Sequence, residues 1–236
     1  MTMRTLSLSV IALALASLGQ APAQAPAKVL ATITGRVNTL DGGKPIKIPV
    51  WVYLKPQARA STSLGKGVVR KIVQRGKVFR APVEVIPLGA TVTFPNLDKF
   101  DHSVFSPAVG AWVGFELGRY RTDPVGRSYE FLEPGEFDIY CDIHPNMSAK
   151  VKVVPTRHVA QVIDGAYRFD DIPPGSYTVV AWTPNSKESA EKVDVGAGTT
   201  TKVFDINLQY KKGPSMHLTS TGTPYPATGY KGSTRP

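Results

Sequence analysis

The chain has 236 residues, of which 42% are hydrophobic, so it is long enough for one or two domains with buried cores. Its formal net charge of +10 favours acidic partners over basic ones, or simply aids solubility. It contains a single cysteine, Cys141, which excludes an internal disulfide.

Residues 1–23 predict an export signal (a signal peptide). Arg4 supplies a positive charge, residues 6–18 form an apolar run too short to span a bilayer, and residues 21–23 (Ala-Pro-Ala) give a small-residue cleavage site. An uncleaved membrane anchor fits this short run less well, and no cysteine for a lipid anchor lies nearby. The expected mature chain is periplasmic or secreted and has no membrane span. It keeps 27 basic and 18 acidic residues, a net charge of +9.

Residues 28–57 predict the beginning of a β-sandwich. Residues 29–37 and 49–54 are rich in β-branched and aromatic side chains, and a turn containing Gly and Pro separates them. The next stretch, residues 55–80, carries eight Lys or Arg residues and no acid. Its first half predicts a loop and its second half a strand.

The central block, residues 58–156, predicts further strands. Apolar and polar side chains alternate in residues 82–94, and again in residues 129–140 around a Glu-Pro-Gly-Glu turn. Nothing in this block has a sustained helical period, although residues 107–119 are ambiguous and allow one short helix. The expected fold class is all-β.

Residues 157–209 again predict strands, separated by an Asp-Gly hairpin turn and a Pro-Pro-Gly turn. Beyond them the chain is rich in Lys, Gly, Pro, Ser and Thr, with four basic residues and no acid. This composition predicts a disordered basic tail over residues 210–236. An arm that binds a partner is the less common alternative.

One short segment carries the residues with metal chemistry. Cys141, His144 and Met147 lie within seven residues at the end of a predicted strand, so a tight loop can bend them toward one point. Thiolate and thioether are soft ligands and imidazole is borderline, a set that suits copper cycling between two oxidation states. A His₂Cys site with a long axial Met needs a second imidazole. The candidate is His102, the only histidine upstream of the segment.

Taken singly, these residues have ordinary interpretations. Cys141 can be a buried structural thiol, Met147 a core side chain, and His102 a loop histidine satisfied by Asp98 or Asp101. Their order and spacing together favour copper, and an unpaired thiol in an oxidising compartment calls for burial or a metal. Structural zinc is the main metallic rival, but Met is a poor zinc ligand and structural zinc sites favour several cysteines.

With these motifs, the block 58–156 resembles the cupredoxin family of Greek-key β-sandwich blue copper proteins, which includes the plastocyanins, pseudoazurins and amicyanins. The short Cys-x2-His-x2-Met loop, with Pro directly after the histidine, is most similar to that of the amicyanins. The resemblance implies one type 1 copper ion, with His102 as the first ligand and Cys141 as the thiolate. It implies that His144 is the imidazole at the solvent edge and Met147 the axial ligand.

One departure from the family is Ser103. Many cupredoxins carry Asn directly after the first ligand histidine, and its side chain ties that loop to the Cys loop. Here this bond is shorter, absent or supplied by another residue, with Asn96 as the candidate. The departure affects the expected rigidity and reduction potential of the site more than copper binding itself.

The flanking pieces, residues 28–57 and 157–209, resemble the two parts of one carboxypeptidase regulatory-like (transthyretin-like, or prealbumin-like) β-sandwich. The resemblance rests on turn-and-strand patterns that recur widely. It implies that the cupredoxin block is nested in a surface loop of this sandwich, where insertions are best tolerated. Two tandem domains are the alternative, but two N-terminal strands would not be stable alone.

The leading functional hypothesis is a copper protein that carries single electrons for a redox partner protein, an acidic one in view of the net charge. The alternative is a non-catalytic module for copper sequestration or delivery, or for binding an envelope or glycan partner. Trp51 and Trp182 are of a type that can line a sugar-binding face, but we expect them in the core. His158 and His217, expected at the surface and in solvent, form no His-x-His pair for a second copper centre, so we expect no enzyme. Nucleic acid is not an expected partner.

Overall fold

The computed structural model describes residues 29–57, 62–202, 206–211 and 217–225; the predicted export signal lies outside them. The described residues form β-strands, one 3-10 turn η1 (Thr62–Gly65) and no α-helix, which confirms the all-β prediction. The strands are β1 (Ala31–Asp41), β2 (Lys44–Pro45), β3 (Trp51–Pro56), β4 (Val69–Lys71), β5 (Val73–Gln74), β6 (Phe79–Arg80), β7 (Val83–Pro87), β8 (Thr91–Asn96), β9 (His102–Ser106), β10 (Phe115–Tyr120), β11 (Asp123–Glu130), β12 (Gly135–Cys141), β13 (Ser148–Val154), β14 (Val159–Gln161), β15 (Ala166–Ile172), β16 (Gly175–Trp182), β17 (Ser189–Val195), β18 (Thr200–Lys202) and β19 (Ile206–Gln209).

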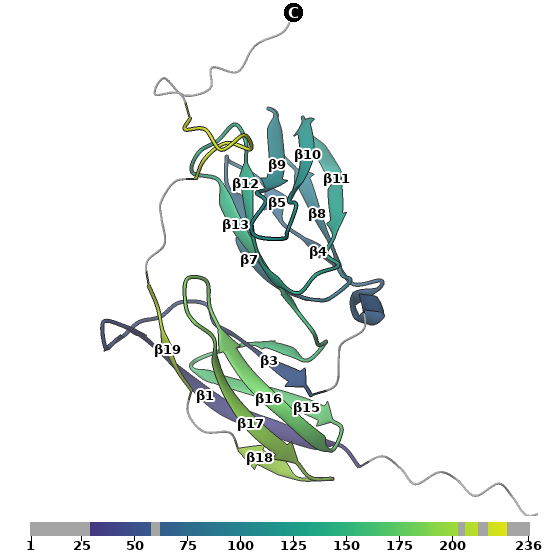
Figure 1. Cartoon of the computed structure of the whole chain (residues 1–236), viewed down its shortest axis with the longest axis vertical. Helices are drawn as coiled ribbons and strands as arrows, with labels where there is room; N and C mark the ends of the chain where they lie inside the picture. Colours follow the sequence, from purple (N-terminus) through teal and green to yellow (C-terminus); the bar gives the residue numbers. More distant parts are fainter. Residues whose placement is uncertain (1–28, 58–61, 203–205, 212–216, 226–236) are drawn as a thin grey trace, which may run out of the picture.

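Strands β4 to β13 form the central sandwich, the upper one in Figure 1. One sheet has the order β10-β9-β12-β13-β7, and the other has the order β11-β8-β5-β6 with β4 also paired to β8. The alternation in the sequence turns every second side chain of a strand inward, so Phe137, Ile139 and Cys141 of β12 all join the core. This buried row ends at Cys141, at one end of the sandwich.

The two flanks of the chain pair with each other in the lower sandwich of Figure 1. Strand β1 is antiparallel to β15 and parallel to β18 and β19, while β3 lies between β14 and β16. Both sheets contribute to one apolar core, which includes Ile33, Leu54 and Leu208. In chain order, β4 to β13 therefore stand between two sets of strands that pair with each other. The carboxypeptidase regulatory-like identity of the flanking strands stays a prediction.

A smaller apolar cluster joins the two sandwiches. Its buried members come from both, namely Val85 and Val154 from the central sandwich and Tyr53, Val180 and Trp182 from the flanking one. Trp182 is fully buried, and its Nε1 donates to Glu136 of β12 at 2.8 Å. The ring of Trp51 lies 6.1 Å from that of Trp182. The burial of Trp182 confirms its expected place in the core.

A charged group lies beside this cluster. The ammonium of Lys152 in β13 contacts Glu136 at 3.2 Å and Glu188 of the flanking sandwich at 2.6 Å. Glu188 also accepts the hydroxyl of Tyr53 at 2.7 Å. Lys152 is only 7% exposed, so its ammonium group has lost most of its hydrating water. The two carboxylates compensate for this loss, which requires both of them to stay close to the ammonium group.

Residues 107–119 contain no helix. Val109 and Trp112 form an isolated β-bridge, and Phe115 begins β10, so the short-helix interpretation is wrong. Gly114, with φ of +72°, sits where an added Cβ would lie 2.5 Å from the carbonyl oxygen of Ser106. The glycine allows this segment to fold back tightly beside β9. Among the described residues, no helix has the length and apolar character needed to cross a membrane.

Candidate metal centre

The loop between β12 and β13 returns on itself directly after Cys141. The backbone N–H of His144 donates to the carbonyl of Cys141 at 3.4 Å, and the N–H of Met147 donates to the carbonyl of His144 at 3.0 Å. The N–H of Cys141 in turn donates to the carbonyl of Met147 at 3.2 Å. These three bonds bring the predicted Cys, His and Met residues into one compact loop at the end of the sandwich.

His102 begins β9, which pairs with β12 beside Cys141. The residues opposite each other are Cys141 and Val104, so His102 lies two positions along from this pair and its side chain is fully buried. Nδ1 of His102 lies 3.7 Å from Sγ of Cys141, and Nδ1 of His144 lies 3.4 Å from the same sulfur. A ligand atom from each of the three residues lies within 4.8 Å of the other two. The structure therefore brings together one thiol and two imidazoles from separate parts of the chain.

Met147, the fourth predicted residue, is 1% exposed and belongs to the same core cluster as Cys141. The compact loop fixes its backbone next to that of Cys141. His158, in contrast, is not part of the metal-ligating group and lies half-buried at the junction of the two sandwiches, before β14.

Asp98 orients the imidazole of His102. Its Oδ2 lies 2.9 Å from Nε2 of His102, so Nε2 carries the proton and Nδ1 directs its lone pair toward Cys141. The same carboxylate accepts the backbone N–H groups of Gly76 and Lys77 at 2.8 and 3.2 Å. Desolvation raises the pKa of Asp98, but these hydrogen bonds outweigh it and the pKa lies below its ordinary value. The carboxylate therefore remains charged and can hold His102 as a metal ligand is commonly held.

Burial also governs the protonation of the candidate ligands. Desolvation lowers the pKa of His102 against the opposing effect of Asp98. It also lowers the pKa of His144 to about 4, helped by repulsion from His102 when that ring is protonated and from the charge of Lys77. Both imidazoles are therefore neutral at pH 7 and keep a lone pair for a cation. Desolvation raises the pKa of the Cys141 thiol, even though backbone N–H groups donate to its sulfur. A bound cation would supply what the thiol needs to lose its proton.

The backbone of Ser103, rather than a side-chain amide, ties the His102 strand to the Cys loop. The carbonyl of Ser103 accepts the N–H of Asp142 at 2.8 Å, and its own N–H donates to the sulfur of Cys141. Asn96 has a different role from the one suggested by the sequence. Its amide group donates to the carbonyls of Phe100 and Tyr120 at 3.0 and 3.1 Å, so it fixes the loop that leads into β9.

The sequence suggested Asp98 or Asp101 as the partner of His102 only under the ordinary interpretation of a loop histidine, and it gave neither residue a role at a metal site; the structure pairs His102 with Asp98. It also placed His217 in a solvated tail, and the structure corrects this for residues 217–225. The imidazole of His217 stacks on the ring of Tyr140, with centroids 4.0 Å apart and an angle of 10° between the planes. The short, polar tail sequence offers no hydrophobic pattern that would have predicted this contact.

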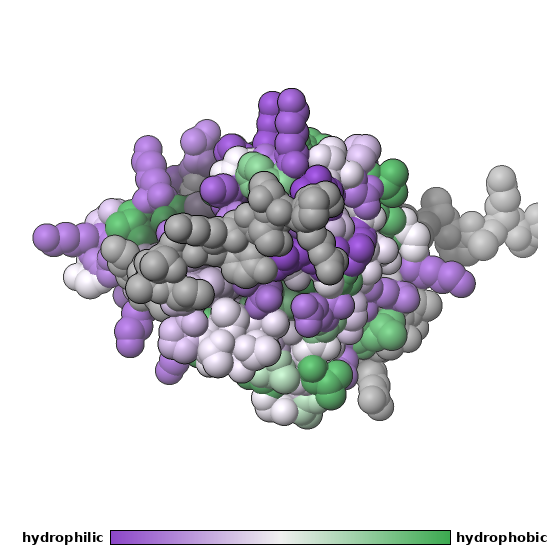
Figure 2. All heavy atoms as spheres, turned by 90° about the horizontal axis from the view of Figure 1, so that it is seen from above, coloured by the Kyte–Doolittle hydropathy of each residue, from purple (hydrophilic) through white to green (hydrophobic). Residues whose placement is uncertain are grey.

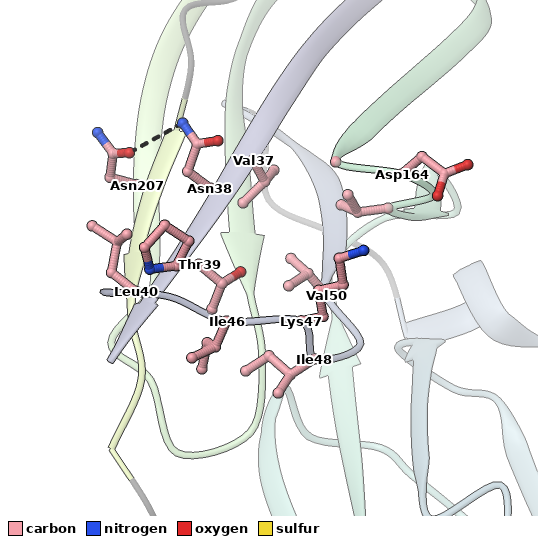
Figure 3. Close-up of a pocket in the computed structure, with 13 residues that line it drawn as sticks. Val37, Asn38, Thr39, Leu40, Ile46, Lys47, Ile48, Val50, Asp164 and Asn207 are labelled. Atoms are coloured by element: carbon pink, nitrogen blue, oxygen red, sulfur yellow. Dashed lines mark hydrogen bonds between the residues drawn. The ribbon is translucent and has the colours of Figure 1, made fainter. Parts of the chain in front are cut away.

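The flanking sandwich has a cavity of its own, of about 680 Å³ (Figure 3). Apolar side chains such as Val37, Ile46 and Ile48 line it together with the polar ends of Asn38 and Asn207. No histidine, cysteine or aromatic side chain is among its lining residues. The cavity therefore offers neither a soft metal ligand nor a ring on which a sugar could stack.

No protein-family model matches the chain, and no curated protein matches it either. Among solved structures, it is similar to a reduced Cu(I) form, at pH 4, of a proline-to-glycine mutant of amicyanin, with 22% identity, a TM-score of 0.33, and coverage of 43% of this chain and 97% of that one. An oxidized methionine-to-lysine mutant of amicyanin (21% identity, TM-score 0.33) covers the same shares of the two chains. A reduced tryptophan-to-tyrosine mutant gives 21% identity and a TM-score of 0.32 with the same coverage. The case for a metal centre in this chain rests on its own side chains.

Proposed function

We propose that this protein binds one type 1 copper ion and carries single electrons. The observation that carries the proposal is the convergence of one buried thiol and two neutral imidazoles, through Sγ and both Nδ1 atoms, at the end of a β-sandwich. This donor set fits copper, and the residues that would hold the ion are His102, Cys141, His144 and Met147. When bound, copper would supply a one-electron redox couple.

The chain's own part is to keep these side chains in place. His102 is fixed by Asp98, and Cys141 by the bonds within its loop and to Ser103. Ligands that move little between two oxidation states keep the cost of electron transfer small, because the surroundings need little rearrangement. The proposal therefore assigns the protein the role of a rigid holder and no catalytic residue.

His144 is the most accessible of the four candidate ligands. It is half-buried, whereas His102, Cys141 and Met147 are buried. The His144 and Phe100 rings pack edge to face with their centroids 5.9 Å apart, and Phe100 is 39% exposed. We propose that a redox partner docks here, over an apolar surface that includes the exposed side chain of Phe100.

The charge beside this surface favours an acidic partner. The ammonium of Lys77 lies 5.5 Å from the centre of the Phe100 ring. Hydrophilic side chains project around the face seen in Figure 2, with smaller hydrophobic groups among them. Positive charge near the docking point would speed encounter with an acidic protein, and the effect should weaken as salt is added. Export to the periplasm or outside the cell belongs to the same proposal.

The first test is to add Cu(II) to the purified metal-free protein and record its visible spectrum. An intense thiolate-to-copper charge-transfer band with one copper per chain is expected. The variant Cys141→Ser should lose the band, whereas His158→Ala, which removes an imidazole outside the site, should keep it. A wild-type protein without the band, or a Cys141→Ser variant that retains it, contradicts the proposal.

A redox titration separates the carrier from the alternative role in copper sequestration or delivery. Reversible one-electron cycling with fast self-exchange supports the carrier. A potential that keeps the ion as Cu(I) under all physiological conditions supports storage or delivery. Preference for zinc over copper in a competition experiment would argue against both.

A further inference from the structure

The described part of the C-terminal segment, residues 217–225, lies against the candidate metal loop. The chain completes the lower sandwich with β19 (Ile206–Gln209), yet this later segment is found beside the upper end of the central sandwich (Figure 1). We call residues 217–225 the C-terminal strap. Its position brings chain that is distant in sequence back to Cys141.

Two hydrogen bonds and a ring stack join the strap to three consecutive residues of the ligand loop. The hydroxyl of Tyr225 donates to the carbonyl of Cys141 at 2.7 Å. The backbone N–H of Ser220 donates to the carboxylate of Asp142 at 2.6 Å. The ring of His217 stacks on Tyr140, as described above. The contacts therefore span residues 140–142, which end β12 and begin the loop.

The strap has a defined structure of its own. The N–H of Gly222 donates to the carbonyl of Thr219 at 2.9 Å, and the N–H of Thr219 donates to the carbonyl of Thr223 at 2.9 Å. Gly222 has φ of +76°, the left-handed conformation that suits such a tight turn. This turn sets Tyr225 near His217, with their ring centroids 5.5 Å apart and the planes at 88°. Both aromatic side chains can therefore face the loop together.

The backbone of Cys141 is bonded from two sides. Its carbonyl accepts from Tyr225 of the strap and from His144 within the loop. The next residue, Asp142, is also bonded twice. Its carboxylate accepts the N–H of Ser220 in the strap, and its own N–H donates to the carbonyl of Ser103. A ligand loop fixed on both sides can open or shift its sulfur less easily than one fixed on a single side.

We propose that the C-terminal strap clamps the ligand loop and that Tyr225 is a positioning residue for Cys141. The clamp shields the thiol of Cys141 and limits movement of the Cys141 backbone. Only the effect of the clamp on a bound ion rests on the proposed copper site. With the strap in place, His144 is half-buried and Phe100 is 39% exposed. The strap thus belongs to the metal centre although it lies far beyond the central block in sequence.

The clamp can be tested on the metal-free protein through the reaction of Cys141 with a thiol reagent. Because Cys141 is the only cysteine of the chain, the measured rate reports on this thiol alone. Tyr225→Phe removes the hydrogen bond to Cys141 and a longer contact, of 3.4 Å, between the hydroxyl and Nδ1 of His217 within the strap. The loss of the bond to Cys141 should raise the rate about fivefold. Truncation after Lys211 removes both bonds and the ring stack, and should raise it on the order of a hundredfold.

The matched control is Tyr177→Phe. The hydroxyl of Tyr177 also donates to a backbone carbonyl, that of Pro173 at 2.8 Å, but in the flanking sandwich. This variant should leave the rate within about twofold of the wild type. If the truncated protein fails to fold, Tyr225→Phe still gives the answer. Equal rates for Tyr225→Phe and the wild type overturn the clamp.

Copper adds a second measurement that a merely stabilising contact would not move. Tyr225→Phe should change the reduction potential and shift the thiolate-to-copper band, because the hydrogen bond acts on the residue that carries the sulfur. An unchanged band and potential overturn the positioning role. If the wild type forms no copper band but Tyr225→Phe still exposes the thiol, the copper proposal fails and the clamp stands.

Discussion

Replacing Asp98 by Asn should weaken copper binding, because the carboxylate makes three contacts that an amide cannot all reproduce. Asp98 is 9% exposed, and its two oxygens accept Nε2–H of His102 and the backbone N–H groups of Gly76 and Lys77. An Asn side chain has one accepting oxygen and one donating NH₂ group. If the amide oxygen of the new side chain faces Gly76, its NH₂ group points at two other donors, the N–H groups of Lys77 and His102. If the amide is turned over, the NH₂ group points at the N–H of Gly76.

The size of the effect follows from these contacts. Loss of the partner behind a ligating histidine lowers metal affinity by about 10- to 100-fold, or about 1.4–2.7 kcal/mol. The donor left facing another donor costs about 1–3 kcal/mol of unfolding free energy in the metal-free protein. We expect both losses in Asp98→Asn. Competition with a copper chelator of known affinity measures the first, and urea unfolding of the metal-free protein measures the second.

Asp101→Asn is the matched control. It removes the same charge three residues away, but the Asp101 side chain is 33% exposed and pairs with Arg121 at the surface at 3.2 Å. Copper affinity should change less than about twofold in this variant, because exposed ion pairs contribute little. Equal copper affinities for Asp98→Asn and the wild type would refute the orienting role of the carboxylate.

Three further predictions concern the scaffold around the site. Trp182→Ala should lower the free energy of unfolding by about 3–5 kcal/mol in urea titrations, because the ring is fully buried between the sandwiches; a loss below about 1 kcal/mol would contradict this. Desolvation raises the pKa of Glu188, but its bonds to Lys152 and Tyr53 lower it below the ordinary 4.5. The ionised Glu188 therefore stabilises the fold fully above pH 4.5, and this stabilisation is lost as the pH falls through the lower pKa of the folded state. Lys152→Met should make the urea midpoint less dependent on pH in this acid range. Gly126→Ala should cost about 1–3 kcal/mol, because φ is +80° and the new Cβ would lie 2.4 Å from the backbone N of Pro95; unchanged thermal unfolding would exclude strain there.

The local part of the candidate site could be predicted from the sequence because its signal is local, and the structure brings His102, Cys141 and His144 together while the ligand role of all four residues stays a prediction. Cys141, His144 and Met147 stand at fixed short spacings after a strand, and any tight loop at that point must gather them. The place of His102 depended instead on chain order and on the pairing of two strands that are distant in sequence. In the structure, β9 and β12 are neighbours, and the Nδ1 atoms of both histidines approach the same sulfur. That copper binds there stays a prediction.

The connection between the two ligand loops could not be predicted from residue types. The sequence predicted a side-chain bond that is shorter at Ser103, absent, or supplied by Asn96. In the structure the carbonyl and N–H of Ser103 make the connection, and Asn96 bonds to Phe100 and Tyr120 instead. Every residue except proline has both of these groups, so the sequence carries no mark of which ones are used. Only the register of β9 against β12 determines that Asp142 and the sulfur of Cys141 meet the backbone of Ser103.

The strap was missed for a related reason. A tail rich in Lys, Gly, Pro, Ser and Thr cannot bury enough apolar surface to fold alone, and by composition residues 210–236 predict disorder. Nine of those residues, 217–225, are nevertheless described against the metal loop, where the contact surface comes from Tyr140 and Phe105 of the sandwich. Composition measures what a segment can bury against itself. A segment that borrows its apolar partner from a preformed sandwich needs only a few rings and hydrogen-bond donors, which is what the strap supplies to the candidate metal centre.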